Sequence, residues 1–338
     1  MLYEHVQAAG VRRLAIIGLA KHAGKTTAMN TIIEEASQAG VSLSLQSIGV
    51  DGERFDALIG VEKPSVQAPV GTMLATAADA LEQGNARLEL LEATGIPSAM
   101  GEIFIARVVE AGSVVLAGVR LVEHARQILS KLEKWVPQLQ IIDGAFDRIA
   151  SATPDLADGI VVCTGASVGR TVADVARETR SALARLRMPG ITEDWQRELA
   201  FLARTSDCIV AGAADIPARV LKGVSPFLLH PQSDPNWPEG AAAVAMPGVV
   251  TDRVLDMLEG AVQTLIVKDG THMMGSLARW KRFERQGARI LAERSIRIAA
   301  VTVNSMSVEG YRLPQKDLLE AITEVAEGLP VVDSIHSH

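Results

Sequence analysis

The strongest constraint on the fold is a repeated alternation between apolar runs of strand length and segments of helical periodicity. The run RLAIIG at 13–18 predicts a first strand, and residues 25–38 place apolar side chains three and four positions apart, as on one face of a helix. The later apolar runs are almost continuous. Such strands, alternating with helices, predict an α/β fold in which a mostly parallel sheet is covered by helices.

The remaining elements follow the same alternation. Further strands are expected at 42–50, 138–143, 158–165, 241–246, 264–269, 297–304 and 329–334. Further helices are expected at 72–83, 121–134, 172–186, 251–261, 274–285 and 315–326. Residues 101–118 predict a β-hairpin that turns near Ala111 and Gly112, and 54–71 predict a loop with proline breakers.

Composition narrows the class of protein. Of 338 residues, 48% are hydrophobic and 22% charged, enough for one large domain or two ordinary ones. The formal net charge of −7 argues against a sequence-independent nucleic-acid binder, which needs a basic surface. The two cysteines, Cys163 and Cys208, lie in apolar runs and predict buried thiols in a reducing compartment. Without a long apolar run or a secretory pattern at the start, we expect a cytoplasmic protein with no membrane contact.

The string GLAKHAGKTT at 18–27 follows the first strand and opens the first helix. It ends as a Walker A phosphate-binding loop does, but the usual G-x-x-x-x-G-K-[ST] pattern would place its first glycine at Leu19, and the glycine here is Gly18. A positive φ would be unfavourable for Leu19. Because strand, loop and helix come in the order that phosphate binding requires, we interpret the string as a variant phosphate loop. The alternative is a plain helix start with a solvated lysine.

The loop assigns chemical roles to consecutive residues. Backbone groups of Gly18, Ala23 and Gly24 are expected to surround the phosphates, with Lys25 reaching the β- and γ-phosphates. The Thr26 hydroxyl is expected to bind Mg²⁺, and Thr27 to contact the α-phosphate. These residues predict a P-loop NTPase-like, nucleotide-binding domain over 1–187. Residues 188–240 are rich in proline and lack a clean period, which indicates an insertion or a junction before a C-terminal α/β portion over 188–338. That portion could complete the same sheet.

Acidic residues that end predicted strands are candidates for metal binding and catalysis. Asp143 ends QLQIID and best suits a Walker B position, a ligand of Mg²⁺ directly or through water. Asp51, with Glu53 nearby, could serve the metal or orient the attacking water. Asp269 ends another strand, and each of these aspartates precedes glycine and could instead form an ordinary turn. Asp158 precedes its strand and is expected to be structural.

Two further positions bear on the nucleotide. TGASVGRT at 164–171 could hold a second anion near Arg170, although most loops of this kind are only connections. No N-K-x-D string is present to recognise guanine, so ATP is favoured. Asn304 ends a late strand, where nucleotide-binding relatives of dethiobiotin synthetase often place an asparagine that contacts adenine; a turn asparagine is the alternative.

Three segments together resemble a known family. GLAKHAGKTT, IDGAFDRIASATPDLADGIVVCTGA, and a late VN followed by a short helix and LPVVD are similar to the P-loop reactivase subunit of lysine 5,6-aminomutase. The resemblance covers most of the chain except 188–240, and VNSMSVEGY departs from the VNPTSPYGY-like run of that family. It implies an ATP-dependent helper that releases damaged cobalamin from an adenosylcobalamin-dependent aminomutase and works with a second, MutS-like subunit.

Three functional hypotheses follow. The first is a Mg²⁺-dependent ATPase in which Lys25, Asp51 and Asp143 carry the chemistry and which reactivates or remodels a partner enzyme. The second is an enzyme of the dethiobiotin synthetase type, a ligase or kinase that transfers phosphate to a small acceptor near Lys63, Asp51 and Arg170. The third is a nucleotide-gated binding module that does not hydrolyse ATP.

Overall fold

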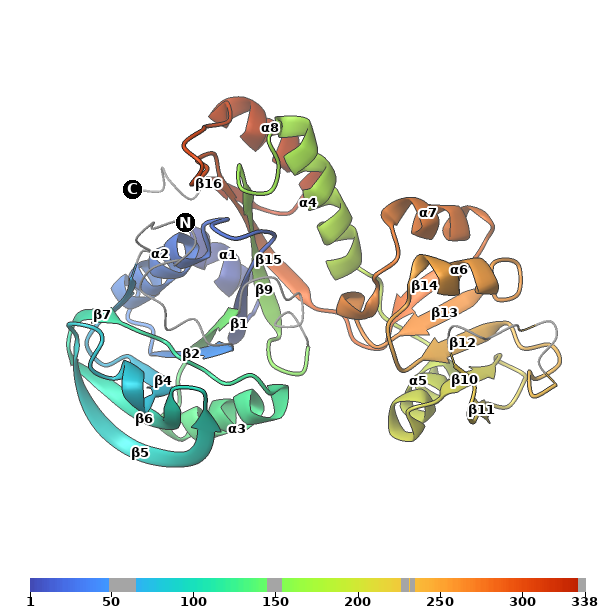
Figure 1. Ribbon diagram of the computed structural model, residues 1–338, viewed down its shortest axis with the longest axis horizontal. Helices are drawn as coiled ribbons and strands as arrows, with labels where there is room; N and C mark the ends of the chain where they lie inside the picture. Colours follow the sequence, from blue (N-terminus) through green and yellow to red (C-terminus); the bar gives the residue numbers. More distant parts are fainter. Residues whose placement is uncertain (49–64, 145–153, 226–230, 232–234, 334–338) are drawn as a thin grey trace. The chain divides into compact units, whose positions relative to one another are not determined.

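The computed structural model describes residues 1–48, 65–144, 154–225, 231 and 235–333. It divides the chain into two compact units (Figure 1). The first unit comprises residues 1–180 and 296–338, and the second comprises 181–295. Within the described part of the chain, no helix has the length and apolar character needed to cross a membrane.

The first unit is built on a nine-stranded mixed sheet with the order β16-β15-β9-β1-β8-β2-β4-β6-β5. All neighbouring pairs from β16 to β4 are parallel, whereas β6 is antiparallel to both β4 and β5. The strands are β1 Arg13–Gly18, β2 Leu43–Ile48, β4 Met73–Ala77, β5 Arg87–Ser98, β6 Gly101–Glu110, β8 Leu139–Gly144, β9 Gly159–Gly165, β15 Arg297–Asn304 and β16 Val331–Asp333. An α/β fold with a mostly parallel sheet is therefore confirmed.

Among its described residues, the first unit also contains a small two-stranded sheet and five α-helices. The short strands β3 and β7 pair antiparallel. These elements are β3 Val66–Ala68, β7 Gly112–Val114, α1 Leu2–Ala8, α2 Lys25–Gln38, α3 Val122–Leu132, α4 Val172–Leu186, whose end lies in the second unit, and α8 Gln315–Ala326. Short 3₁₀ turns lie at 78–80 and 133–135.

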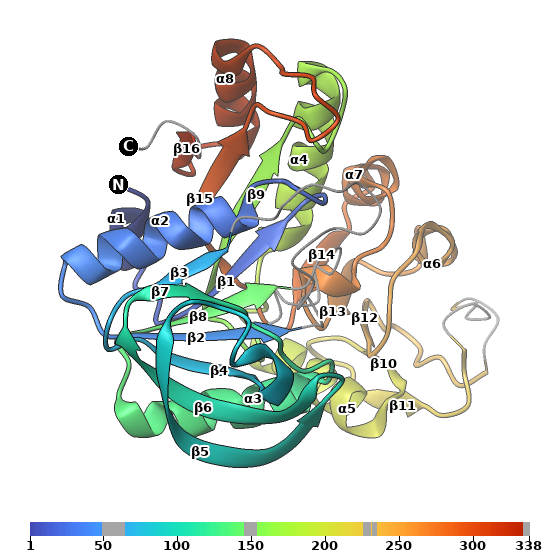
Figure 2. The same ribbon diagram turned by 60° about the vertical axis from the view of Figure 1, so that its left-hand side comes forward.

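One face of the large sheet is covered by α1 and α2, which lie side by side (Figure 2). Met29, Ile32 and Ile33 of α2 are fully buried there against Leu14 and Ile16 of β1. The helical spacing that predicted α2 thus follows its buried stripe. Because side chains alternate along a strand, alternate residues of the central strands face α2 and the others face away.

The opposite face carries α3 and α4, joined to the strands by buried polar contacts. The Gln46 side chain on β2 donates to the Ala125 carbonyl of α3 at 3.4 Å. The hydroxyls of Thr164 on β9 and Thr179 on α4, both fully buried, lie 2.7 Å apart. A buried polar group costs free energy unless it is hydrogen-bonded, so these contacts help to fix which helix packs on which strand.

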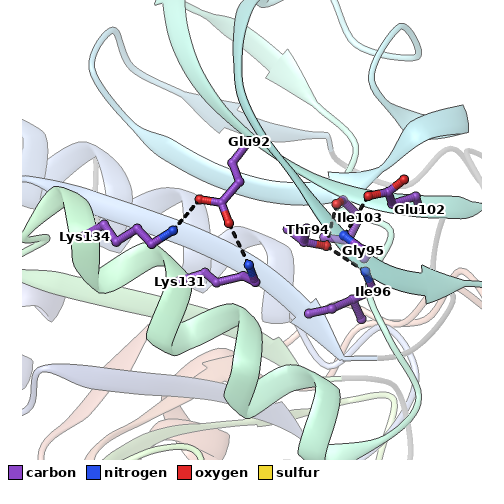
Figure 3. Close-up of polar contacts among 8 residues, drawn as sticks. All are labelled: Glu92, Thr94, Gly95, Ile96, Glu102, Ile103, Lys131 and Lys134. Carbon is purple, nitrogen blue, oxygen red and sulfur yellow. Dashed lines mark hydrogen bonds and ion pairs between the residues drawn. The ribbon is translucent and has the colours of Figure 1, made fainter.

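The edge strand β5 contains a bulge (Figure 3). Its pairing with β6 shifts between Ala93 and Pro97, and Gly95 between them adopts a φ of 73°. The Gly95 N–H donates to the Glu102 side chain at 2.7 Å instead of to a ladder carbonyl. Bulges and proline interrupt the regular ladder that an edge strand would otherwise offer to another chain.

Glu92, just before the bulge, connects this edge to α3 and the turn that follows it. Its two carboxylate oxygens accept hydrogen bonds from Lys131 at 2.6 Å and Lys134 at 2.7 Å (Figure 3). The Glu92 side chain is 21% exposed. The two lysine hydrogen bonds outweigh the opposing effect of burial and hold the pKa of Glu92 below its usual range.

The second unit has a five-stranded sheet with the order β11-β10-β12-β13-β14. β12, β13 and β14 are parallel, and β10 is antiparallel to both of its neighbours. The strands are β10 Ile209–Gly212, β11 Arg219–Leu221, β12 Ala243–Met246, β13 Thr264–Val267 and β14 Arg289–Ala292. The helices are α5 Asp194–Ser206, α6 Asp252–Leu258 and α7 Leu277–Arg285.

The helices of the second unit cover both faces of its sheet. Leu199 and Ala203 of α5 belong to one core cluster with Ile266, while Leu255 of α6 and Phe283 of α7 belong to a separate cluster. The segment without clean periodicity, 188–240, contains α5, β10 and β11. This segment therefore belongs to a folded unit. It contains regular elements although its sequence is rich in proline and shows no clean period.

Two expected elements differ in the structure, and several observed elements were not expected. Residues 72–83 were expected to be helical, yet β4 occupies 73–77 and only 78–80 form a 3₁₀ turn. The hairpin expected at 101–118 is wrong because β6 pairs with β4 and β5, and β7 with β3. The strand β3 at 66–68 lies within the stretch 54–71 that was expected to be a loop, and α1, β5 and β14 were not anticipated.

The unit boundaries also differ from the expected division at 187 and 188. The first unit ends at Arg180 and resumes at Ile296, so the second is inserted within it in sequence. β15 pairs with β9, and β16 pairs with β15 in the large sheet. The C-terminal portion therefore completes that sheet, a possibility that the sequence left open.

Candidate functional site

The segment between β1 and α2 forms a loop with two residues at positive φ. Gly24 adopts a φ of 93° and is the N-terminal flanking residue of α2, and His22 adopts a φ of 59°. Leu19 does not have a positive φ, and its N–H donates to the Cys163 carbonyl at 2.9 Å. Leu19 therefore does not adopt the unfavourable positive φ, because the two residues with positive φ lie later in the loop.

The N-terminus of α2 has the character of an anion site. Gly24 offers no side chain to cap it, and the first turn contains no acidic residue. The first backbone N–H groups of a helix have no acceptor within the helix, and the helix dipole makes that end electropositive. Thr26 and Thr27 lie in this turn and are partly exposed. The arrangement favours a phosphate or carboxylate at the start of α2.

Lys25 extends across the end of β1 to the neighbouring strand β8. Its ammonium donates a hydrogen bond to the Gly144 carbonyl at 2.5 Å. A Cβ atom at Gly18 would come within 3.1 Å of both the Lys25 stem and the Ala20 carbonyl. Gly18 therefore leaves room for the lysine stem, which gives the displaced glycine a structural reason.

Asp143 lies at the same edge, one residue before the lysine's acceptor. It is paired with Ile16 in the register of β8 and β1. By alternation it shares the face of Ile141, which belongs to the core cluster containing α2. The carboxylate is therefore on the α2 side of the sheet, next to the strand that leads into the loop.

Cys163 lies on β9, next to β1, and the charges of Lys25 and Asp143 both affect the pKa of its thiol. Burial raises the pKa of its thiol to about 12, and the charges of Lys25 and Asp143 act on it in opposite directions. The buried thiol therefore stays protonated at neutral pH. Sequence reasoning anticipated burial of Cys163 but not its place below the loop.

Asn304 reaches the same edge two strands away from β1. β15 pairs with β9 and β9 with β1, so Asn304 lies roughly 10 Å from the end of β1 at the usual strand spacing. Its side-chain oxygen accepts from the Met306 N–H at 2.9 Å, the contact expected of a turn asparagine. A Cβ at Gly165 would lie only 2.0 Å from the Asn304 carbonyl, so these strand ends approach very closely.

The loop that follows β9 is held by residues near the C-terminus. The Tyr311 hydroxyl donates to the Ala166 carbonyl at 2.5 Å. The Arg170 guanidinium pairs with Glu309 at 2.9 Å and is 81% exposed. The Glu309 carboxylate therefore already pairs with Arg170, the residue that the sequence suggested for binding a second anion. Tyr311 was not singled out in the sequence, where nothing links it to this loop.

The remaining candidates lie elsewhere. Asp51 and Glu53 lie outside the described residues, as does Lys63. Asp269 belongs to the second unit, where its carboxylate accepts from the Thr271 N–H. Asp158 accepts from the N–H groups of residues 12 and 13 at the opposite end of β1, in the structural role expected of it.

The donor set suits Mg²⁺ better than a transition metal. In the described ranges, no group of three or more His, Cys, Asp or Glu side chains could hold a metal ion. A Mg²⁺ ion in nucleotide sites takes one or two protein oxygens and completes its shell with phosphate and water. The Thr26 hydroxyl and the Asp143 carboxylate are oxygen donors of that kind.

Comparisons of the chain with protein-family models, curated proteins and solved structures found no match.

Proposed function

We propose that the first unit binds ATP with Mg²⁺ through the loop at 18–27 and hydrolyses it, as a P-loop NTPase does. One observation carries this proposal: Lys25, at the start of α2, donates to Gly144, the residue directly after Asp143. A cation, a helix N-terminus and a carboxylate at adjacent strand ends are the groups that phosphoryl transfer requires.

Each residue has a role in this proposal. The loop amides and the Lys25 ammonium hold the phosphates and stabilise the charge that develops on the transferred group. When nucleotide binds, Lys25 exchanges its hydrogen bond to the Gly144 carbonyl for phosphate oxygens. Asp51 remains the candidate for orienting the attacking water, and Asn304 for contacting the adenine, because the nucleoside would extend along the sheet edge from α2.

Two residues of the first unit would hold the Mg²⁺ ion that accompanies ATP. When bound, Mg²⁺ would supply positive charge that offsets the negative charge of the phosphates. Thr26 would hold it with its hydroxyl, and Asp143 with its carboxylate, directly or through water. The raised pKa of Cys163 keeps that neighbouring thiol neutral, so it adds no competing negative charge beneath the phosphates.

We further propose that the nucleotide cycle drives work on a partner enzyme. The resemblance of GLAKHAGKTT and of residues 142–166 to the lysine 5,6-aminomutase reactivase supports a cytoplasmic reactivation factor. Its partners would be a cobalamin-dependent aminomutase and a second, MutS-like subunit. The nucleotide site can be tested without knowing the partner, whereas the role in reactivation cannot.

The test measures ATP hydrolysis by the purified chain with Mg²⁺, alone and with the MutS-like subunit and lysine 5,6-aminomutase that has been inactivated by turnover. We expect the mutase to stimulate hydrolysis and to recover activity when fresh adenosylcobalamin and ATP are added. Replacing ATP by a non-hydrolysable analogue is the control and should abolish recovery. Stimulation by small carboxylic acids but not by the mutase would contradict reactivation and indicate an enzyme of the dethiobiotin synthetase type. ATP binding without any hydrolysis would indicate a binding module.

A further inference from the structure

The second unit contains a cavity of about 210 Å³ beyond the carboxyl ends of its parallel strands. The basic lining residues come from three places: Arg204 on α5, Lys268 directly after β13, and His272 in the turn that follows. Ala203, Met246 and Ile266 contribute apolar lining. In open α/β sheets, ligands bind in this position, outside the carboxyl ends of the strands.

Arg204 is held in place by a mostly buried carboxylate. Its Nε donates to Glu293 at 3.0 Å, and the Glu293 side chain is 14% exposed. The guanidinium also lies 5.5 Å from the ring centre of Phe201. Its Nη1 and Nη2 atoms have no hydrogen-bond partner among the described residues. They remain available as the two-pronged donor that matches a carboxylate or phosphate.

His272 is held in the same way by a second carboxylate. Its Nδ1 lies 2.9 Å from Asp269, whose side chain is 4% exposed. Burial opposes ionisation of Asp269, but hydrogen bonds from His272 and Thr271 outweigh it and keep the pKa of that carboxyl below its usual range. The ionised Asp269 fixes the ring through Nδ1. Within the described part of the chain, Nε2 has no protein partner, and it is the ring nitrogen left for a ligand.

The two held side chains come from elements far apart in the sequence, yet both line one cavity. The Arg204 side chain is 46% exposed and the His272 side chain 24% exposed, so a ligand can reach both donors. Holding each donor against a mostly buried carboxylate costs rotational freedom but prepares it for that ligand. Lys268 adds a positive charge to the same lining. Asp207 and Glu293 also line the cavity, so an ammonium ligand is the alternative, although the Glu293 carboxylate is already bonded to Arg204.

We propose that this cavity binds a small organic anion, a carboxylate or phosphate on a short apolar body, through Arg204, Lys268 and His272. A cavity of this volume suits a ligand with a few carbon atoms and one charged group. The apolar lining contacts the body of the ligand. This site is independent of the nucleotide site, since all of its residues belong to the second unit.

The test uses the full chain labelled with ¹³C at the methionine methyl groups, because Met246 lines the cavity. Substitution of Met246→Leu assigns its NMR signal. Butyrate and butylphosphonate are titrated as the anions, with 1-butanol and butylammonium as the neutral and cationic controls. We expect at least one anion to shift the Met246 signal saturably and neither control to do so. Failure of both anions, or an equal response to butanol or butylammonium, would overturn the proposal.

Variants then test the residues. Arg204→Gln and His272→Gln should each weaken anion binding about tenfold or more, the loss expected for one charge-assisted hydrogen bond. Arg197→Gln is the matched control, because Arg197 is on the same helix, pairs with the exposed Asp194 and does not line the cavity. Unchanged affinity in both cavity variants would contradict the assignment. The titration with wild-type protein decides the ligand class even if one variant fails to fold. Lys25→Ala should leave this binding unchanged.

Discussion

The Lys25 ammonium donates to the Gly144 carbonyl and so joins the first residue of α2 to the end of β8. The two residues are 119 positions apart in the sequence. Because Gly144 follows Asp143, this one contact places the cation of the loop beside the only acidic candidate that the described residues bring to this edge. The proposed roles of Lys25 and Asp143 depend on that relationship.

Substitution of Asp143→Asn should separate metal use from nucleotide binding. The amide keeps the size of the carboxylate but loses the charge that a hard cation prefers. We expect ATP binding without Mg²⁺ to change less than threefold, roughly the size of a typical surface effect. Mg²⁺-dependent hydrolysis should fall by about 10²-fold, the scale seen when one electrostatic contact to the transition state is lost. Measuring turnover over a range of Mg²⁺ concentrations checks this.

A matched control for Asp143 is Asp158→Asn at the opposite end of β1. Asp158 accepts two backbone hydrogen bonds and should affect stability without changing the Mg²⁺ dependence of hydrolysis. If both variants shift the Mg²⁺ dependence equally, or if Asp143→Asn hydrolyses ATP at the wild-type rate, Asp143 does not serve the metal.

Gly165→Ala should be strongly destabilising. Gly165 has a φ of 151°, and its Cβ would lie 2.0 Å from the Asn304 carbonyl, so β9 and β15 would have to separate. We expect a loss of about 3 kcal/mol or more. Gly40→Ala is the comparison, because Gly40 has a φ of 73° with nothing within 4 Å and should cost only about 1 kcal/mol. Urea unfolding followed at the ¹⁹F signal of fluorinated Trp135 reports on the first unit, and equal midpoints would contradict this.

Glu92→Gln should make the stability of the first unit less dependent on acid pH. The two lysines hold the folded-state pKa of Glu92 below 4.5, so its stabilisation is present above that value and is lost as pH falls through the folded pKa. At neutral pH we expect a loss of up to about 1 kcal/mol, because the pair is partly exposed. The difference from wild type in urea unfolding should therefore shrink towards the acid limit of folding.

The exposed ion pair between Glu89 and Arg107 on the neighbouring strands supplies the control. Both side chains are about half exposed, so Glu89→Gln should change stability less than Glu92→Gln at neutral pH. A Glu92→Gln difference that stays constant or grows as pH falls would mean that the lysine contacts do not carry the stabilisation.

The sequence predicted best where local and tertiary preferences agree. β1 and α2 have the expected bounds, because the apolar run is central to the sheet and the helical stripe is the buried face. The helix predicted at 72–83 was wrong because local and tertiary preferences disagree there. Met, Leu and Ala are good helix formers, but β4 is fully buried between two strands, and this pairing overrides the local propensity.

The sequence did not predict which strands pair when they lie far apart in the chain. β6 and β7 are separated by one residue and were expected to pair, yet each pairs with an earlier strand. The same limit applies to the site. The local loop pattern was enough to place Lys25 at a helix start, but its contact with Gly144 and the position of Cys163 below it depend on which strands flank β1.

The most direct test of the central claim is calorimetric titration of ATP with Mg²⁺ into wild-type, Lys25→Ala and Lys316→Ala proteins. Lys316 is 87% exposed on α8 and controls for the loss of one positive charge. The account predicts that Lys25→Ala weakens ATP binding about tenfold or more, since a charge-assisted hydrogen bond is lost, and that Lys316→Ala binds as wild type does. Equal affinity of Lys25→Ala and wild-type protein, or no ATP binding by either, would contradict it.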